Sequence, residues 1–447
     1  MNSTQTQVWR PEDDTRPTAE CPEGLPIFRP DILDFIEQKT QGLSGELRKL
    51  SMDLHSNPEL AFEEKHAHDV LTEFMSTQGF QVESHYLLPT AWLATFRHGE
   101  RGRTVGINSE MDALPGVGHA CGHNLIAIAG VAVACAMKAA LERFDISGTV
   151  KLLGTPAEEA AVGKIILLQK GAYDNMDICL MCHPAPGPKG SVSLSSSLAI
   201  KGFEAEYFGH TAHAALSPWE GVNALDAAVL AYNNVNALRQ HLKPDIRVHG
   251  IFKGKDWVTN IIPDYAMYHV AVRAPTLARQ EAAAERSVFR SGALATGCTS
   301  KITSTVHMYD LRQNKVLGEE VANIVRSRYG TVDYEWGIAS ASTDFGNVSY
   351  EIPSLHPGFG GRTFFSFFVM GAHSRCFHLS AIPTIIGGGN HTREFATAAA
   401  TMAAHEACLD VSKALAVTGV RYLIDVDFHD RVQREFERDK VAREMIN

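Results

Sequence analysis

The order of apolar runs along the chain constrains its fold more than any other feature of the sequence. Between residues 92 and 181, short apolar runs of strand length alternate with longer helical patterns. This alternation is typical of a parallel sheet covered by helices, so we expect an α/β, doubly wound, mostly parallel domain. The expected strands are 92–96, 104–109, 149–153 and 178–181, and the expected helices are 31–54, 63–78, 125–144 and 163–173.

The pattern changes near residue 198. From there to residue 309 the expected order is strand, helix, two strands, helix and strand, which indicates a compact α+β unit. A chain of 447 residues is long enough for two domains. We therefore predict an inserted α+β domain at 198–309, a main domain split into 31–197 and 310–447, and a flexible, proline-rich N-terminal arm at 1–30.

Composition argues against several classes of partner. The formal net charge is -10, so we expect no nucleic acid partner, which would favour a basic surface. The longest apolar run, 125–137, is shorter than a bilayer span requires, so we expect no membrane segment. Residues 1–30 contain no apolar signal-like stretch, and a cytoplasmic location is the expectation.

Side chains that can bind a metal follow several of the expected strands. Loops at the carboxyl ends of neighbouring parallel strands meet at one edge of a sheet, and ligands bind there. Four separate segments therefore deliver polar groups to one place. The residues are Asp112, Cys121, His123, Glu158, Glu159 and His183.

These residue types suit one kind of chemistry. Thiolate, imidazole and carboxylate are the usual ligands of zinc and similar divalent ions. In the adjacent pair Glu158-Glu159, one carboxylate can bind the metal while the other takes a proton from metal-bound water. Singly, a Glu-Glu pair or a Cys-Gly-His turn is more often structural. Their joint placement favours a metal site.

A second motif overlaps the last of these segments. Cys179-Leu-Met-Cys182-His183 matches the C-x-x-C-H pattern that attaches c-type haem. Both cysteines lie in an apolar run, and haem attachment goes with an exported protein. A redox C-x-x-C pair should open a helix, which the following His183-Pro184 does not favour. We therefore prefer the metal interpretation.

The candidate residues belong to a longer, ordered series of motifs between residues 45 and 410. This series resembles the M20 metallopeptidase family, in particular its amidohydrolase and Xaa-Arg dipeptidase-like branch. The matching motifs are H-x-x-P-E-L at 55–60, E-x-D-A-L-P at 110–115, G-H-A-C-G-H-N at 118–124, G-T-P-A-E-E at 154–159, G-H-T-A-H-A at 209–214, G-V-N-A-L-D-A at 221–227, S-T-D-F-G-N-V at 342–348 and H-T-R-E-F at 391–395.

The resemblance implies a zinc-exopeptidase-like catalytic domain with a lid and dimerisation domain at 198–309. It implies a homodimer that hydrolyses an amide bond of a dipeptide or N-acyl amino acid with two divalent metal ions, Zn²⁺ first and Mn²⁺ or Co²⁺ as alternatives. An amide-forming enzyme on the same fold, and a non-catalytic binding protein with a degenerate site, are the alternatives. The implied ligands are Cys121, His123, Glu159, His183 and His391.

The resemblance also implies further roles. Glu158 would be the general base, and Asp112 would orient a metal ligand. His213, reaching the site of a partner subunit, would stabilise an oxyanion. Asn260 and Arg273 would face the carboxylate of the substrate.

Two features depart from the family pattern. Glu110 stands where the wider family often has histidine, and Cys121 substitutes for that ligand. The stretch 360–389, with its aromatic-rich run 363–369, is absent from the pattern and is either an insertion or a gene-model artefact such as a retained intron. The other candidates for the last ligand are therefore His356, His373 and His378.

Overall fold

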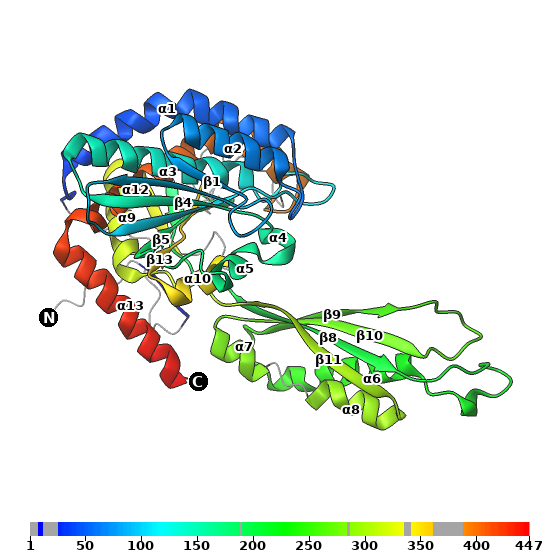
Figure 1. Cartoon of the computed structure of the whole chain (residues 1–447). Coiled ribbons are helices and arrows are strands. Elements are labelled where there is room, and N and C mark those ends of the chain that lie inside the picture. The colour runs from blue at the N-terminus through cyan, green and yellow to red at the C-terminus, as the bar shows by residue number, and fades with distance from the viewer. Residues whose placement is uncertain are drawn as a thin grey trace, which may run out of the picture. The chain divides into compact units, whose positions relative to one another are not determined.

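Figure 1 shows a computed structural model of the chain, which describes residues 8–11, 26–187, 190–283, 287–334, 341–360 and 388–446. The chain divides into two compact units. The main unit comprises Met1–Ser196 and Leu311–Met445, and the inserted unit consists chiefly of Ser197–Asp310.

The main unit is built on a six-stranded sheet of order β1-β2-β4-β3-β5-β13. Strands β4, β3, β5 and β13 run parallel, whereas β1 and β2 form an antiparallel edge. The predicted α/β class with a mostly parallel sheet is confirmed. The strands are β1 (Gln81–Ser84), β2 (Trp92–His98), β3 (Thr104–Glu110), β4 (Gly148–Thr155), β5 (Ile178–Leu180) and β13 (Ser354–Leu355).

Helices cover both faces of this sheet (Figure 1). Successive side chains of a strand point to opposite faces, so Leu152 of β4 packs into one buried cluster and Leu153 into another. Helices α1, α2, α3 and α12 contribute to the first cluster, and α5 and α10 to the second. Their bounds are α1 (Pro30–Ser56), α2 (Lys65–Thr77), α3 (His123–Phe144), α5 (Gly163–Gln169), α10 (Phe345–Glu351) and α12 (Met402–Ile424).

Helix α3 is the centre of the main unit. By length and apolar composition it could cross a membrane, but 89% of its most apolar window is buried inside the unit. A Cβ at Gly130 would lie only 2.8 Å from the carbonyl oxygen of Asn108 on β3. Glycine therefore lets the helix approach the sheet closely. This contact brings the start of α3 to the carboxyl end of β3.

A small second sheet of the main unit, which the sequence does not predict, has the order β12-β7-β14-β6. Its strand β6 contains His183, which pairs with Gly358 of the parallel strand β14. The strands are β6 (His183–Pro184), β7 (Ser191–Ser193), β12 (Thr331–Asp333) and β14 (Gly358–Phe359). The other helices in the described part of this unit are α4 (Glu158–Ala161), α9 (Lys315–Arg328), α11 (Arg393–Ala399) and α13 (Val426–Ile446).

The inserted unit contains an antiparallel sheet of order β11-β8-β10-β9. Along β10, buried and partly buried residues alternate, as expected when one face of a sheet packs against helices. Helices α7 and α8 lie where the second helix of this unit is expected. The elements are β8 (Ala199–Phe208), α6 (Ala224–Leu238), β9 (Arg247–Gly254), β10 (Tyr265–Ala274), α7 (Leu277–Ala283), α8 (Ser287–Thr296) and β11 (Thr299–Met308).

A buried ion cluster joins residues 8–11, within the predicted N-terminal arm, to α13. The guanidinium of Arg10 lies 2.6 Å from Asp439 and 2.8 Å from Glu435, and Arg312 also contacts Asp439. These side chains are at most 12% exposed. Because charges removed from water depend on their partners, loss of one member leaves the others unpaired.

We expect Asp439→Asn to lower the free energy of unfolding by about 3 kcal/mol at pH 7, measured by urea denaturation. Burial opposes ionisation of Asp439, but Arg10 and Arg312 hold its pKa below the usual range. This stabilisation is therefore present above the unfolded-state pKa of about 3.9 and is lost as the pH falls below it. The deficit of the variant should shrink in acid.

The exposed pair Arg29–Asp31 provides the control. Asp31→Asn should cost no more than about 0.5 kcal/mol, because solvent screens such a pair. If both variants lose the same free energy of unfolding, the buried ion cluster is no more stabilising than an exposed ion pair.

Candidate metal centre

The candidate side chains converge at the carboxyl edge of the main sheet. Asp112 lies two residues beyond β3, and His123 is the first residue of α3. Glu158 follows β4, and His183 follows β5. These four residues are at most 8% exposed. The parallel order of β4, β3 and β5 therefore gathers segments that are far apart in the sequence.

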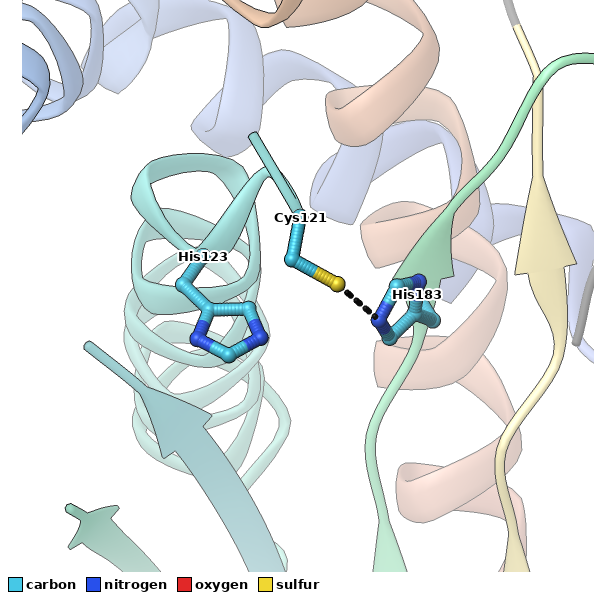
Figure 2. A group of neighbouring side chains, drawn as sticks. All are labelled: Cys121, His123 and His183. Carbon is cyan, nitrogen blue, oxygen red and sulfur yellow. Dashed lines mark hydrogen bonds between the residues drawn. The ribbon is translucent and has the colours of Figure 1, made fainter. Parts of the chain in front are cut away.

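Figure 2 shows the thiol and two imidazoles of this cluster. Cys121 comes from the turn before α3 and points toward His183, with its Sγ 3.3 Å from the Nε2 atom. The ring of His123, in the first turn of α3, lies edge-on to that of His183 with centroids 6.2 Å apart. One potential ligand atom from each of the three residues lies within 4.8 Å of the others.

Hydrogen bonds fix how the two imidazoles face the cluster. Nδ1 of His123 donates to Asp112 Oδ1 at 3.1 Å, and Nδ1 of His183 donates to the carbonyl of Pro184 at 2.9 Å. Each ring therefore turns its Nε2 lone pair inward, as metal-binding histidines do. Nε2 of His123 is buried and accepts no hydrogen bond from any described residue. A bound metal ion would satisfy this atom, so the residues fit such an ion.

Glu159 and His391 form a second group with Cys121. His391 Nε2 lies 3.3 Å from Glu159 Oε1, and one atom of each residue lies within 4.8 Å of the others. The backbone N–H of Glu159 donates to Asp112 Oδ2 at 3.0 Å. Asp112 thus binds His123 through one oxygen and the Glu159 segment through the other, which links the two groups of ligands.

The backbone of His391 is held in a sparsely populated conformation. Its φ angle is +71°, and its N–H donates to the carbonyl of Ala120 at 2.8 Å. A non-glycine residue is kept in this region only when its surroundings require it. The neighbouring Asn390 donates to the carbonyls of Pro184 at 3.0 Å and Cys121 at 3.3 Å. These bonds attach the late histidine to the turn that carries Cys121.

Glu158 adjoins both groups without hydrogen bonding to any described residue. It starts the short helix α4, directly after Ala157 with a φ angle of +59°. Burial, followed by the negative charges of Glu110 and Asp344, raises the pKa of Glu158 well above its usual range. Nearby divalent cations would act in the opposite direction. Such a carboxylate is suited to accepting a proton and releasing it again.

The sequence did not reveal the residue that holds the turn before Glu158. The buried carboxylate of Glu64 accepts hydrogen bonds from the backbone N–H of Ala157 at 2.9 Å and from Thr90 Oγ1 at 2.7 Å. Glu64 lies on a loop before α2, and no metal-ligand or catalytic motif includes it. The role of Glu64 is recognisable only from its tertiary contact with Ala157.

We expect Glu64→Ala to lower both stability, by about 2 kcal/mol, and turnover, because it orphans the buried N–H of Ala157 and frees the turn. Thermal unfolding and steady-state kinetics would measure the two effects. Glu64→Gln keeps an acceptor for Ala157 and should retain most of both. If Glu64→Ala matches the wild type in kcat, the contact does not position Glu158.

The other candidates have different locations. His213, Asn260 and Arg273 belong to the inserted unit, where His213 and Asn260 are exposed and Arg273 is half-buried. His356 is fully buried with its ring centroid 6.0 Å from that of His183, but it belongs to none of the groups of potential ligands. His373, His378 and residues 361–387 as a whole lie outside the described residues.

The fold and the cluster together define a class of protein. A parallel sheet whose carboxyl edge gathers a thiol, imidazoles and carboxylates around a buried glutamate is the architecture of a metal-dependent hydrolase. A family model described as peptidase family M20/M25/M40 matches residues 106–387. The chain belongs to this family and is a peptidase or amidohydrolase acting on C–N amide bonds.

Curated relatives match nearly the whole chain. It is 38% identical to a Xaa-Arg dipeptidase of Mus musculus over 90% of this chain and 91% of the relative. It is 36% identical to the Xaa-Arg dipeptidase of Homo sapiens over the same shares. A more distant relative is an N-acetyl-L-cysteine deacetylase of Bacillus subtilis, which is 28% identical over 54% of this chain and 64% of its own.

Solved structures share the fold. A candidate aminohydrolase from methicillin-resistant Staphylococcus aureus superposes with a TM-score of 0.71 at 21% identity, over 87% of this chain and 99% of that one. A dinuclear metal-binding M20 peptidase from Bacillus subtilis has a TM-score of 0.64 at 19% identity, over 86% and 99% of the two chains.

Proposed function

We propose that this protein hydrolyses dipeptides or N-acyl amino acids that carry a free carboxylate, using two divalent metal ions. Zn²⁺ is the first expectation, with Mn²⁺ and Co²⁺ as alternatives. The observation that carries the proposal is the inward-facing ligand cluster beside the carboxylate of Glu158, which forms no ion pair with any described residue. The metals would be held by Cys121, His123, Glu159, His183 and His391.

Metal ions bound there would lower the pKa of a water molecule and polarise the scissile carbonyl. Glu158 would take the proton of that water and later deliver it to the leaving amine. Its carboxylate lies with His123 and Glu159 in one group of neighbouring ligand atoms. The proposed base therefore stands among the side chains that would hold the metals.

The orientation of His213 supports a role in stabilising the oxyanion. Its Nδ1 accepts backbone hydrogen bonds from Ala215 at 3.2 Å and Leu216 at 3.1 Å. The proton of the neutral ring must then be on Nε2 of this exposed side chain, where it is available as a donor. An N–H aimed at the developing negative charge of a tetrahedral intermediate is what an oxyanion site requires.

The proposed homodimer would bring this histidine to the site of the partner subunit. Strand β9 is an edge of the inserted sheet, and its Ile251 and Phe252 are 60% and 38% exposed. On α6, Val229, Leu230 and Tyr232 are also exposed. An open edge strand beside exposed apolar side chains suits pairing with a second copy of the chain.

Arg273 and Asn260 would bind the carboxylate of the substrate. A guanidinium is well shaped for a two-point contact with a carboxylate. The carbonyl of Asn260 accepts from the N–H of Ala214 at 3.0 Å, so the segments that carry Asn260 and His213 adjoin within the inserted unit. Two relatives are named for cleaving Xaa-Arg dipeptides, so a basic carboxy-terminal residue is the first substrate class to test.

The test is a panel of dipeptides and N-acyl amino acids, assayed with metal-free protein reloaded with Zn²⁺, Mn²⁺ or Co²⁺. Metal-stimulated cleavage of at least one dipeptide class is expected, with Xaa-Arg and Xaa-Lys ahead of neutral dipeptides. Condensation of the product pair, assayed in parallel, distinguishes hydrolysis from amide synthesis. Purified protein that binds no divalent metal and cleaves none of the panel would overturn the proposal.

A further inference from the structure

A lysine with no solvent exposure lies beside the proposed catalytic base. Lys164, in the first turn of α5, places its Nζ 2.6 Å from Glu110 Oε1 and 2.7 Å from Asp344 Oδ1. Its backbone N–H also donates to Asp344 Oδ2 at 2.8 Å. The three side chains are fully buried and come from segments far apart in the sequence. None of the roles proposed above uses this lysine.

Lys164 forms ion pairs with two of three neighbouring carboxylates. One oxygen from each of Glu110, Glu158 and Asp344 lies within 4.8 Å of the others. Carboxylates at this separation repel one another strongly in a buried site. The ammonium of Lys164 forms ion pairs with Glu110 and Asp344, and no ion pair to Glu158 occurs among the described residues. Among the described residues, Glu158 is therefore the one of the three carboxylates that has no ion pair with Lys164.

Glu110 has a second oxygen that reaches the ligand cluster. Its Oε2 lies 3.3 Å from Nε2 of His123, the nitrogen that faces the proposed metal. A carboxylate oxygen at that distance is close enough to join the same coordination sphere, because zinc–nitrogen and zinc–oxygen bonds are each about 2 Å long. Lys164 forms an ion pair with the other oxygen of Glu110. This pair offsets the negative charge of the Glu110 carboxylate and restricts its rotation.

We propose that Lys164 is a positioning residue: it ties Glu110 and Asp344 at the wall of the site, keeps Glu110 out of the metal coordination sphere and leaves Glu158 as the single carboxylate free to move protons. This inference rests on the proposed function, because it takes Glu158 as the base. It adds a reason why one of three adjacent carboxylates serves as the base.

The test is Lys164→Met, which keeps the length of the side chain and removes its charge. We expect kcat to fall about 100-fold or more, with KM changed by less than about threefold. In Co²⁺-loaded protein, entry of Glu110 into the coordination sphere should weaken the visible absorption bands, which report coordination geometry. Circular dichroism establishes that the variant is folded.

Matched variants separate positioning from damage. Lys164→Met combined with Glu110→Gln should restore the wild-type Co²⁺ spectrum, because the freed carboxylate is gone. Lys138→Met, which breaks a solvent-exposed pair with Glu142, should leave spectrum and kcat unchanged. Unaltered spectrum and kcat in Lys164→Met, or a double variant with the spectrum of Lys164→Met alone, would overturn the inference.

Should Lys164→Met fail to fold, Glu110→Gln alone remains decisive. Its Co²⁺ spectrum should equal that of the wild type, and an altered spectrum would mean that Glu110 is itself a ligand, which overturns the inference. Failure of the proposed function looks different, since it would leave Glu158→Gln fully active whatever the Co²⁺ spectra of the lysine variants.

Discussion

Glu158→Gln is expected to keep its metal ions and to lose about 10³-fold in kcat. The amide has the size and shape of the carboxylate but cannot take a proton from water. Glu158 lies beside the proposed ligands without being one of them, so metal binding should persist. Steady-state cleavage of a dipeptide together with elemental analysis of the purified variant would measure both effects.

The adjacent residue provides the matched comparison. Glu159→Gln removes a proposed ligand, so this variant should lose metal as well as turnover. Metal loss in both variants would mean that Glu158 is also a ligand. Unchanged turnover in Glu158→Gln would show that Glu158 is not the general base. Because the two residues are neighbours on α4, a nonspecific disturbance of that helix should affect them alike.

His213→Ala should lower kcat by about 10²- to 10³-fold while the metal content stays unchanged. The substitution removes the proposed oxyanion donor, and His213 is not one of the proposed metal ligands. Kinetics at saturating substrate would measure the loss. A neighbouring exposed histidine, His210, serves as the control, and His210→Ala should cost much less.

Mixing the two inactive proteins tests whether His213 acts on the partner subunit. In a symmetric dimer of one Glu158→Gln chain and one His213→Ala chain, one site would combine an intact Glu158 with an intact His213. Random exchange of subunits should therefore restore about one quarter of wild-type activity. If His213 acts within its own subunit, no active site forms and the mixture stays inactive.

Regular elements of the main unit could be predicted because their periodicity is local. Strand β3 and helix α3 fall within two residues of the predicted bounds. The two-residue strands β6 and β14 could not be found this way, because they are defined only by pairing with strands that are distant in the sequence. His183 was therefore expected in a loop, whereas the structure holds it in a short strand.

The sequence likewise indicated some residues of the candidate site, and others became apparent only in the structure. The ordered motifs indicated Cys121 and His123, whose thiol and imidazole groups are common metal ligands. Glu64 could not be singled out, because it stands next to Glu63 in the sequence and differs only in its surroundings: Glu63 is exposed and Glu64 is fully buried against the Ala157 turn. Lys164 was missed for a related reason, since a lone lysine in a helical pattern normally indicates a solvated surface.

The hydrogen bonds around Pro184 have a consequence for how this chain can vary in length. Phe359, just before the stretch 361–387, accepts from the N–H of Ala185 at 3.1 Å, and Asn390, just after it, donates to the carbonyl of Pro184 at 3.0 Å. Both ends are thus fastened to one peptide unit, and that fastening, rather than the number of residues between, fixes where His391 stands. The placement of His391 therefore depends on bonds to this peptide unit and to the turn of Cys121, which both lie outside the stretch 361–387.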